Sequence, residues 1–365
     1  MRSAIAIVLI TFVVAAPARA AGLNQSYLPY LGHLPPTEAQ WFEAAFDVYA
    51  EAFIEPDGRV VDPQNGGITH SESQGYGLLL ALLGNDPATF ERIWQFARFK
   101  LQRADKLFAW KWVPGEGIAD RNNATDGEML IATALALAGM RWENGAYMAE
   151  AEAIADAIGR KLIMRHGRRK VILPGEWAAP SRYNPNITLN LSYYIPLTFP
   201  VLQALAPRHP WDEVLADGLE LMGDLIHPPS DWSTINDHGE PVPAPGFPRR
   251  FSYDAVRIPL YLLQNGMTHP KINEHLFAVW GDDDDGNLFT FDVYSFKRLE
   301  KLWGNSYQFS YELLHCAVNG EPVSYESLEM KMDNYFDSSL HLLAVASMYA
   351  DWPECFPGSQ GARPS

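Results

Sequence analysis

The chain has 365 residues, of which 47% are hydrophobic and 12% aromatic, so it is large and apolar enough to bury a substantial core. Its 28 basic and 44 acidic residues give a net charge of −16. An acidic surface of this kind disfavours nucleic acid and anionic membranes as partners.

The first element is an N-terminal leader. Arg2 precedes an apolar run from Ala4 to Ala16, and a small-x-small cleavage site ends at Ala20. This pattern predicts a signal peptide over residues 1–20, hence a periplasmic or secreted protein. Removing Arg2 and Arg19 leaves 26 basic against 44 acidic residues, a net charge of −18. No later run reaches the ~18 apolar residues that a membrane span needs.

After the leader, the chain reads as a series of helices with little alternating strand pattern. Apolar residues recur at helical spacing in eleven segments, 38–54, 73–84, 88–103, 126–141, 146–164, 189–205, 211–226, 255–264, 295–304, 307–317 and 335–350. Helical pairs repeat about every 50 to 60 residues, which suits an array of helical hairpins. No polar linker divides the chain, so residues 21–365 are expected to form one domain.

The connections between these helices are long and rich in proline, glycine, asparagine and aspartate. Loops of that length are usually functional or disordered, and tryptophan argues against disorder. The aromatic residues in or beside them are candidate platforms for flat apolar ligand faces, with simple packing as the alternative for each. They include Trp110, Trp112, Trp177, Trp232, Tyr183, Tyr193 and Tyr253.

Three acids stand in the first turns of predicted helices that are apolar on nearly every side. Each follows a residue able to cap its helix: Ser71 before Glu72, Thr125 before Asp126 and Ser252 before Asp254. One such acid alone is more often placed to complement the helix dipole than for catalysis. If inner helices of a helical ring run parallel, however, their N-termini share one face, and the three acids converge.

Converging carboxylates beside aromatic loops are the equipment of glycoside hydrolysis. One acid must be protonated to serve the leaving oxygen, another must be ionised to activate water, and sugar rings stack on aromatic faces. The acidic run 282–285 is instead interpreted as a solvated turn, because Gly281 occupies the first ligand position that a calcium loop would need. Cys316 and Cys355 are the two cysteines, and the sequence leaves open whether they pair.

Several motifs in order resemble family 8 of the glycoside hydrolases, and among them the endo-β-1,4-glucanases encoded with bacterial cellulose synthase. They are "GRVVDPQNGGITHSESQGYGLLLAL", "NNATDGEMLIATALALAG", "LNLSYYIPLTFPVLQAL" and "RRFSYDAVRIPLYLL", and the resemblance runs from Trp41 to Cys355. It implies an all-α fold, an (α/α)6 barrel with long functional loops at one face. It also implies an inverting mechanism, a β-glucan substrate and a role in cellulose biosynthesis.

The resemblance assigns roles to individual residues. Glu72 matches the general acid, Asp254 the general base, and Asp126 the acid that grips the distorted sugar. Tyr193 and Arg257 match residues near the base and the reactive ring. No cofactor or metal is implied, and the protein is expected to act as a monomer, with a functional association with a cellulose synthase complex as a further expectation.

Two questions stay open at this stage. The family usually has glycine where this chain has Ser73. If that glycine lets the backbone approach the substrate closely, the serine lowers activity. If the glycine only begins the helix, the serine is harmless, because it falls within the capping box that Ser71 and Gln74 are predicted to form. The activity also has alternatives, a chitosanase or mixed-linkage glucanase of the same family, or a glucan-binding protein with weakened catalysis.

Overall fold

The computed structural model describes residues 24–182, 185–281 and 286–359. The predicted signal peptide and the acidic run 282–285 lie outside these residues. Buried side chains from the whole described length form one continuous apolar cluster.

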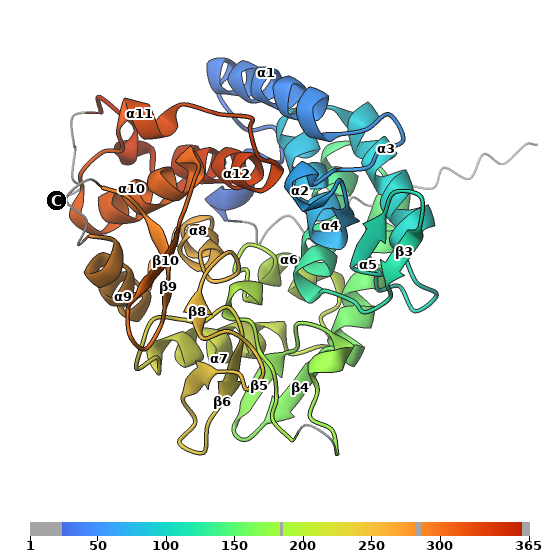
Figure 1. The fold of residues 1–365 in the computed structure, drawn as a ribbon. Coiled ribbons are helices and arrows are strands. Elements are labelled where there is room, and N and C mark those ends of the chain that lie inside the picture. The colour runs from blue at the N-terminus through green and yellow to red at the C-terminus, as the bar shows by residue number, and fades with distance from the viewer. Residues whose placement is uncertain (1–23, 183–184, 282–285, 360–365) are drawn as a thin grey trace, which may run out of the picture.

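Within the described residues, α-helices alternate between an outer and an inner layer (Figure 1). The outer helices are α1 (Pro36–Phe53), α3 (Pro87–Phe96), α5 (Gly145–Lys161), α7 (Trp211–Gly223), α9 (Pro270–Trp280) and α11 (Tyr325–Leu328). The inner helices are α2 (Ser71–Leu83), α4 (Thr125–Arg141), α6 (Phe199–Leu205), α8 (Arg257–Leu263), α10 (Asn305–Asn319) and α12 (Tyr335–Asp351). Helix α12 packs against both α10 and α2, which closes the inner ring. The fold is the expected (α/α)6 barrel.

Burial explains which helices are inside. Every residue of α2 except Glu72 is buried, and all of α8 is buried. A helix that is apolar on all sides is stable only when neighbours surround it. The outer helix α3 is amphipathic and buries Phe90, Ile93 and Trp94 toward the ring. The exception in α2 is informative, because the one residue left partly exposed is an acid.

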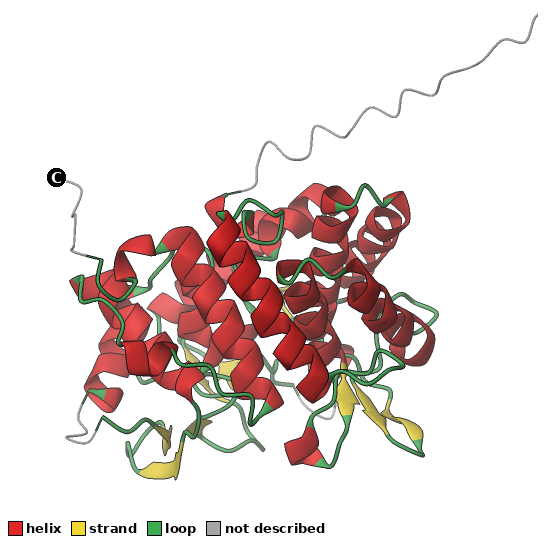
Figure 2. Ribbon diagram, turned by 90° about the horizontal axis from the view of Figure 1, so that it is seen from above, coloured by secondary structure: helices red, strands yellow, loops and turns green. Residues whose placement is uncertain are grey.

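The short strands all lie in connections that lead from an outer helix to the next inner helix. They are β1 (Thr69–His70), β2 (Lys111–Val113), β3 (Gly117–Asp120), β4 (Ile163–His166), β5 (Arg169–Ile172), β6 (Ser233–Ile235), β7 (Pro241–Pro243), β8 (Arg250–Phe251), β9 (Phe289–Asp292) and β10 (Arg298–Lys301). They pair antiparallel as β1-β2-β3, β4-β5, β6-β7 and β8-β9-β10. Because the inner helices all begin at that end, the strands gather on one side of the ring (Figure 2).

The structure corrects parts of the predicted helix pattern. Of the expected helix 189–205, only Phe199–Leu205 forms an α-helix. Pro196 interrupts the helical pattern, whereas Pro200 is compatible with the first turn of α6. The expected helix 295–304 is wrong: this segment follows a turn at Phe296, whose φ is 57°, and forms β10. Helices α9 and α11 and the strands were not predicted. The segment 88–103 ends in a π-helical turn, Ala97–Leu101.

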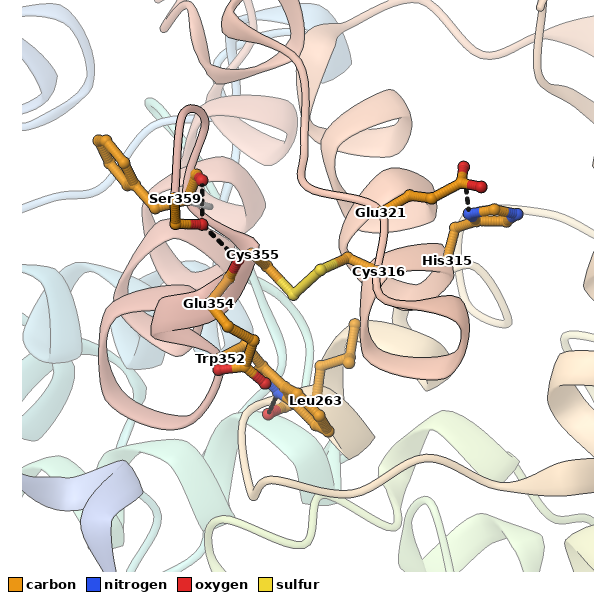
Figure 3. Close-up of a disulfide and its surroundings, with 9 residues drawn as sticks. Leu263, His315, Cys316, Glu321, Trp352, Glu354, Cys355 and Ser359 are labelled. Atoms are coloured by element: carbon orange, nitrogen blue, oxygen red, sulfur yellow. Dashed lines mark hydrogen bonds and ion pairs between the residues drawn. A yellow bond between two sulfur atoms is a disulfide. The ribbon is translucent and has the colours of Figure 1, made fainter. Parts of the chain in front are cut away.

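Cys316 and Cys355 form a disulfide, which answers the question left open by the sequence. It joins α10 to the turn η7 (Pro353–Cys355) that follows α12, as Figure 3 shows. Trp352, just before that turn, donates its indole N–H to the carbonyl of Leu263 at the end of α8. The C-terminal segment is therefore fastened to two inner helices. Among the helices of the described residues, none combines the length and apolar character needed to cross a membrane.

Candidate active site

Glu72 projects from the first turn of α2. The residue that caps this helix is His70, not Ser71 as predicted: its Nδ1 accepts from the Ser73 N–H, and the Ser73 hydroxyl accepts from the His70 N–H at 3.2 Å each. Ser73 also donates to the His70 and Val60 carbonyls and is fully buried. The serine that replaces the family glycine therefore anchors the start of α2, and it does not line the hollows described below.

Asp126 lies in the first turn of α4, 1% exposed. The predicted cap at Thr125 is also wrong, because the Thr125 hydroxyl donates to the Leu173 carbonyl. The residue at the cap position is Ala124, which has no side chain able to cap the helix. The acid is brought to Glu72 by Gly127. A Cβ at Gly127 would lie 2.6 Å from the Ser71 carbonyl carbon and 2.7 Å from the Glu72 nitrogen. Only glycine permits this approach, so the two helix starts are in direct backbone contact.

Asp254 does not lie in a helix. It stands in the turn that precedes α8, since α8 begins at Arg257, so the prediction that Ser252 caps a helix containing Asp254 is wrong. The turn is held by Asp231, whose Oδ1 accepts from the Ser252 N–H at 2.8 Å and from the Ala255 N–H at 3.1 Å. Sequence reasoning missed Asp231. Its only signal was an acid beside Trp232 in a long loop.

Arg257 joins the three acids. Its Nη1 pairs with Glu72 and lies 3.0 Å from Oδ2 of Asp126, and its Nη2 lies 2.8 Å from Oδ1 of Asp254. Nη2 also donates to the hydroxyl of Ser192. The Arg257 side chain is 1% exposed. A buried guanidinium with several carboxylate partners is a rigid fork that fixes the position of each.

Two further side chains hold the acids, and sequence reasoning missed both. The hydroxyl of Tyr335, at the start of α12, donates to Oε1 of Glu72 at 3.1 Å. The amide of Asn190 donates to Oδ1 of Asp254 at 2.9 Å. No local sequence pattern indicates these contacts, because Asn190 is 64 residues from Asp254 and Tyr335 is 263 residues from Glu72.

Burial changes the acidity of this cluster. It raises the pKa of Asp126, and the neighbouring charge of Glu72 raises it further, while Arg257 opposes both. Burial also raises the pKa of Asp254, against the opposing effects of Arg257 and Asn190. One guanidinium cannot neutralise three carboxylates, so the cluster retains a proton at a pH at which exposed carboxylates are ionised.

The acids face a hollow of about 420 Å³. Its lining includes four of the seven predicted aromatic residues, namely Trp110, Trp177, Trp232 and Tyr193, together with Glu72, Asp126 and Asp254. Tyr183 lies outside the described residues. Tyr253 lines a neighbouring hollow instead. Trp112 lies elsewhere: its ring packs edge-on against Phe96 and under the guanidinium of Arg59. Trp112 lines neither of these hollows.

The aromatic side chains form a connected wall. The rings of Trp177 and Trp232 lie 5.5 Å apart, and Tyr193 lies 6.4 Å from Trp232. Phe247, which no sequence motif marks, stacks on Trp232 at 5.2 Å. Trp177 is 41% exposed despite its apolar ring. Flat apolar faces held open beside carboxylates suit a ligand with apolar ring faces and polar edges.

A family profile described as "Glycosyl hydrolases family 8" matches residues 36–278. Among curated relatives, an endoglucanase of Cellulomonas uda is 37% identical over 232 residues, covering 61% of this chain and 63% of that protein. A probable endoglucanase of Novacetimonas hansenii is 39% identical over 246 residues, covering 64% of this chain and 70% of that protein.

Solved structures agree with this match. The endo-β-1,4-glucanase CMCax from Acetobacter xylinum superposes with a TM-score of 0.75 at 32% identity, covering 85% of this chain and 98% of that one. The profile match spans the segments that carry Glu72, Asp126 and Asp254. The chain therefore belongs to family 8 of the glycosyl hydrolases.

Proposed function

We propose that this chain is an endo-acting β-1,4-glucanase that cleaves its substrate with inversion of configuration. The observation that carries the proposal is the set of three carboxylates around Arg257, beside an aromatic wall. The relatives named endoglucanase support the choice of substrate. An endo mode is supported by a second hollow of about 430 Å³ that shares His70, Glu72 and Asp254 with the first, so that a chain can extend on both sides of the acids.

Glu72 is the proposed general acid. It is the one partly exposed residue of α2 and lines both hollows, which supports a role at a bond that crosses between them. In this role its carboxyl gives a proton to the leaving glycosidic oxygen. Tyr335 and Arg257 each hold one oxygen of the carboxyl.

Asp254 is the proposed general base. Asn190 and Arg257 both bond its Oδ1, so Oδ2 is the oxygen that we assign to water activation. Asp126, which is 1% exposed and lines the first hollow, is proposed to accept hydroxyl hydrogen bonds from the distorted sugar ring. Such bonds strengthen as the ring flattens toward the transition state.

The test is a set of three variants on a glucan panel. Glu72→Gln and Asp254→Asn should fold, bind cello-oligosaccharide and release almost no reducing ends, because each amide keeps the shape and loses the proton chemistry. Asp126→Ala should lower kcat more than it raises KM. Near-normal turnover in any of the three removes that residue from its assigned role.

The substrate panel decides between the proposal and its alternatives. Carboxymethyl cellulose, lichenan, chitosan and xylan are offered at equal mass, and reducing ends are counted. We expect carboxymethyl cellulose to lead. Fastest release from chitosan or lichenan identifies a chitosanase or a mixed-linkage glucanase, and binding without any release identifies a glucan-binding protein.

We also propose that the protein is exported and serves cellulose biosynthesis beside a cellulose synthase complex, as a monomer. The disulfide supports export, because such bonds persist in oxidising compartments. N-terminal sequencing of protein recovered from the periplasm or the medium should begin at Ala21. A mature chain that still begins at Met1 contradicts the export proposal.

A further inference from the structure

A third hollow, of about 530 Å³, lies beyond the two that meet at the acids. Its walls come from the end of β10, the start of α10 and the segment before α12. They include the amide side chains of Gln64, Asn305 and Asn334, the ammonium group of Lys331 and the indole of Trp303. Some of these groups already bond the backbone: Gln64 Nε2 donates to the Asp333 carbonyl, and Asn334 Oδ1 accepts from the Phe336 and Asp337 N–H groups. The hollow thus combines polar side chains with one flat apolar ring.

This distal hollow adjoins the hollows at the acids. It shares Gln64, Tyr307 and Asn334 with the second hollow, and the second shares Glu72 and Asp254 with the first. We call the three adjoining hollows the groove. The acids lie where the first and second hollows meet, and Trp303 lines the third.

Trp303 is unusually exposed for its size. Its relative exposure of 74% is the highest among the large hydrophobic residues of the described chain. Leaving an indole in water forgoes the free energy of burial, and this exposed indole lines a hollow beside polar side chains. Lys301 places its ammonium nitrogen 4.4 Å from the ring centroid, which helps to fix the ring in the open.

The backbone after Trp303 keeps it there. Gly304 has a φ of 137°, a conformation that other residues rarely adopt. A Cβ at Gly304 would lie 2.1 Å from Oδ1 of Asp337, and that same oxygen accepts from the Ser306 N–H at 3.1 Å. The turn that presents Trp303 is thus locked between α10 and α12.

We propose that the distal hollow is a sugar-binding subsite in which the indole of Trp303 stacks on a glucose ring far from the bond that is cleaved. The inference rests on the proposed glucanase function and adds the reach of the substrate. A pyranose ring presents C–H groups on its faces and hydroxyls at its edge, which match an aromatic platform ringed by amides. The consequence is a preference for longer chains.

The experiment compares Trp303→Ala with Phe99→Ala. Phe99 is 67% exposed and lines none of the three hollows, so it controls for loss of an exposed ring. kcat/KM is measured for purified cello-oligosaccharides from the tetraose to the heptaose. The ratio of the longest to the shortest reports the distal contact alone, because short substrates are cleaved without reaching it.

In the parent protein we expect this ratio to rise with chain length. Trp303→Ala should lower kcat/KM for the longest substrate about five- to tenfold and leave the shortest unchanged, and Phe99→Ala should change neither. The proposal is overturned if Trp303→Ala affects all lengths equally or none of them. An equal effect on all lengths instead assigns Trp303 to folding or to partner contacts.

A binding measurement distinguishes failure of the subsite proposal from failure of the glucanase proposal. If the parent protein cleaves none of these substrates, calorimetric binding of cellohexaose to the parent and to Trp303→Ala replaces the rate measurement. Weaker binding only in Trp303→Ala supports the subsite without the activity. Equal affinity, or no binding to the parent, overturns it.

Discussion

At the scale of single residues, the acids are held less by their own helices than by partners distant in the sequence. Glu72 depends on Tyr335 and Arg257, and Asp254 depends on Asn190 and Asp231 through its turn. This is why the acids were predictable from local motifs while most of their partners were not. A hydrogen bond across 263 residues leaves no local pattern.

Ser73 offers the sharpest test of a departure from the family pattern. Ser73→Gly removes one half of the capping box and adds backbone freedom, so we expect a loss of unfolding free energy of about 1–2 kcal/mol. Activity should stay within a few-fold, since Ser73 is buried away from the groove. Denaturant unfolding and kcat/KM measure the two effects. A hundredfold gain in activity contradicts this interpretation.

Asp351 gives a pH prediction. Burial raises its pKa to about 6, against a lowering by the hydroxyl of Ser26, which donates to its Oδ2 at 2.8 Å. The folded state then binds a proton more tightly than the unfolded state. The contribution of Asp351 to the free energy of unfolding is therefore greatest below the unfolded pKa of ~3.9, and it falls as the pH rises to about 6. Asp351→Asn keeps an acceptor and does not titrate.

The measurement is the difference in unfolding free energy between the parent protein and Asp351→Asn at several pH values. Between pH ~4 and ~6, the unfolding free energy of the variant should rise relative to that of the parent. Above that range, the difference between the two should stay constant. A difference that does not change with pH shows that Asp351 has no raised pKa. A difference of opposite sign shows that Ser26 outweighs burial.

At the scale of elements, close helix contact sets the distance between acids. Gly127→Ala forces a Cβ into the Ser71 backbone, which should separate the starts of α2 and α4. We expect unfolding free energy to fall by about 1–3 kcal/mol and kcat to fall at least about tenfold. Gly145→Ala, at the start of α5, meets no atom within 4 Å and serves as the matched control. Equal behaviour of the two variants contradicts the proposed role of this contact.

The disulfide acts on the element that closes the ring. Cys316 and Cys355 are 39 residues apart, so replacing both by alanine should lower unfolding free energy by about 3–4 kcal/mol, chiefly through the freer unfolded chain. Activity at low temperature should remain, because neither cysteine lines the groove. Thermal unfolding with and without a reductant gives the comparison. An unchanged melting temperature contradicts the prediction.

The elements also show what sequence patterns can and cannot predict. The inner helices α2, α4 and α12 were predicted well, because a helix that is apolar on nearly every side must be surrounded by other elements. The caps at Ser71, Thr125 and Ser252 were predicted wrongly, each for its own reason. Ser71 already lies inside α2, which His70 caps. The Thr125 hydroxyl donates to the Leu173 carbonyl, and α8 begins five residues after Ser252, at Arg257. The β9–β10 hairpin was predicted as a helix over 295–304, because the spacing of its basic and apolar residues resembles that of an amphipathic helix.

At the scale of the whole molecule, one topological rule places the chemistry. Every connection from an outer helix to the next inner helix emerges on the same side, and the described strands, the acids and the aromatic wall all belong to that side. The convergence of Glu72, Asp126 and Asp254 was predictable from this rule, although their caps were assigned wrongly. Asp231 and Trp303 were not, since their roles depend on loop conformation.

The stereochemistry of cleavage belongs to the whole molecule, because it depends on the gap across the groove. Glu72 on α2 and Asp254 before α8 bond different nitrogens of the Arg257 guanidinium, and inversion of configuration is the outcome proposed above. An inverting enzyme keeps its carboxyls roughly 6.5–9.5 Å apart to admit water, against about 5–5.5 Å in a retaining one. Proton NMR of a fresh digest should therefore show the α-anomer first. If the β-anomer leads, or azide rescues Asp254→Ala as a glycosyl azide with retained configuration, then Asp254 is a nucleophile.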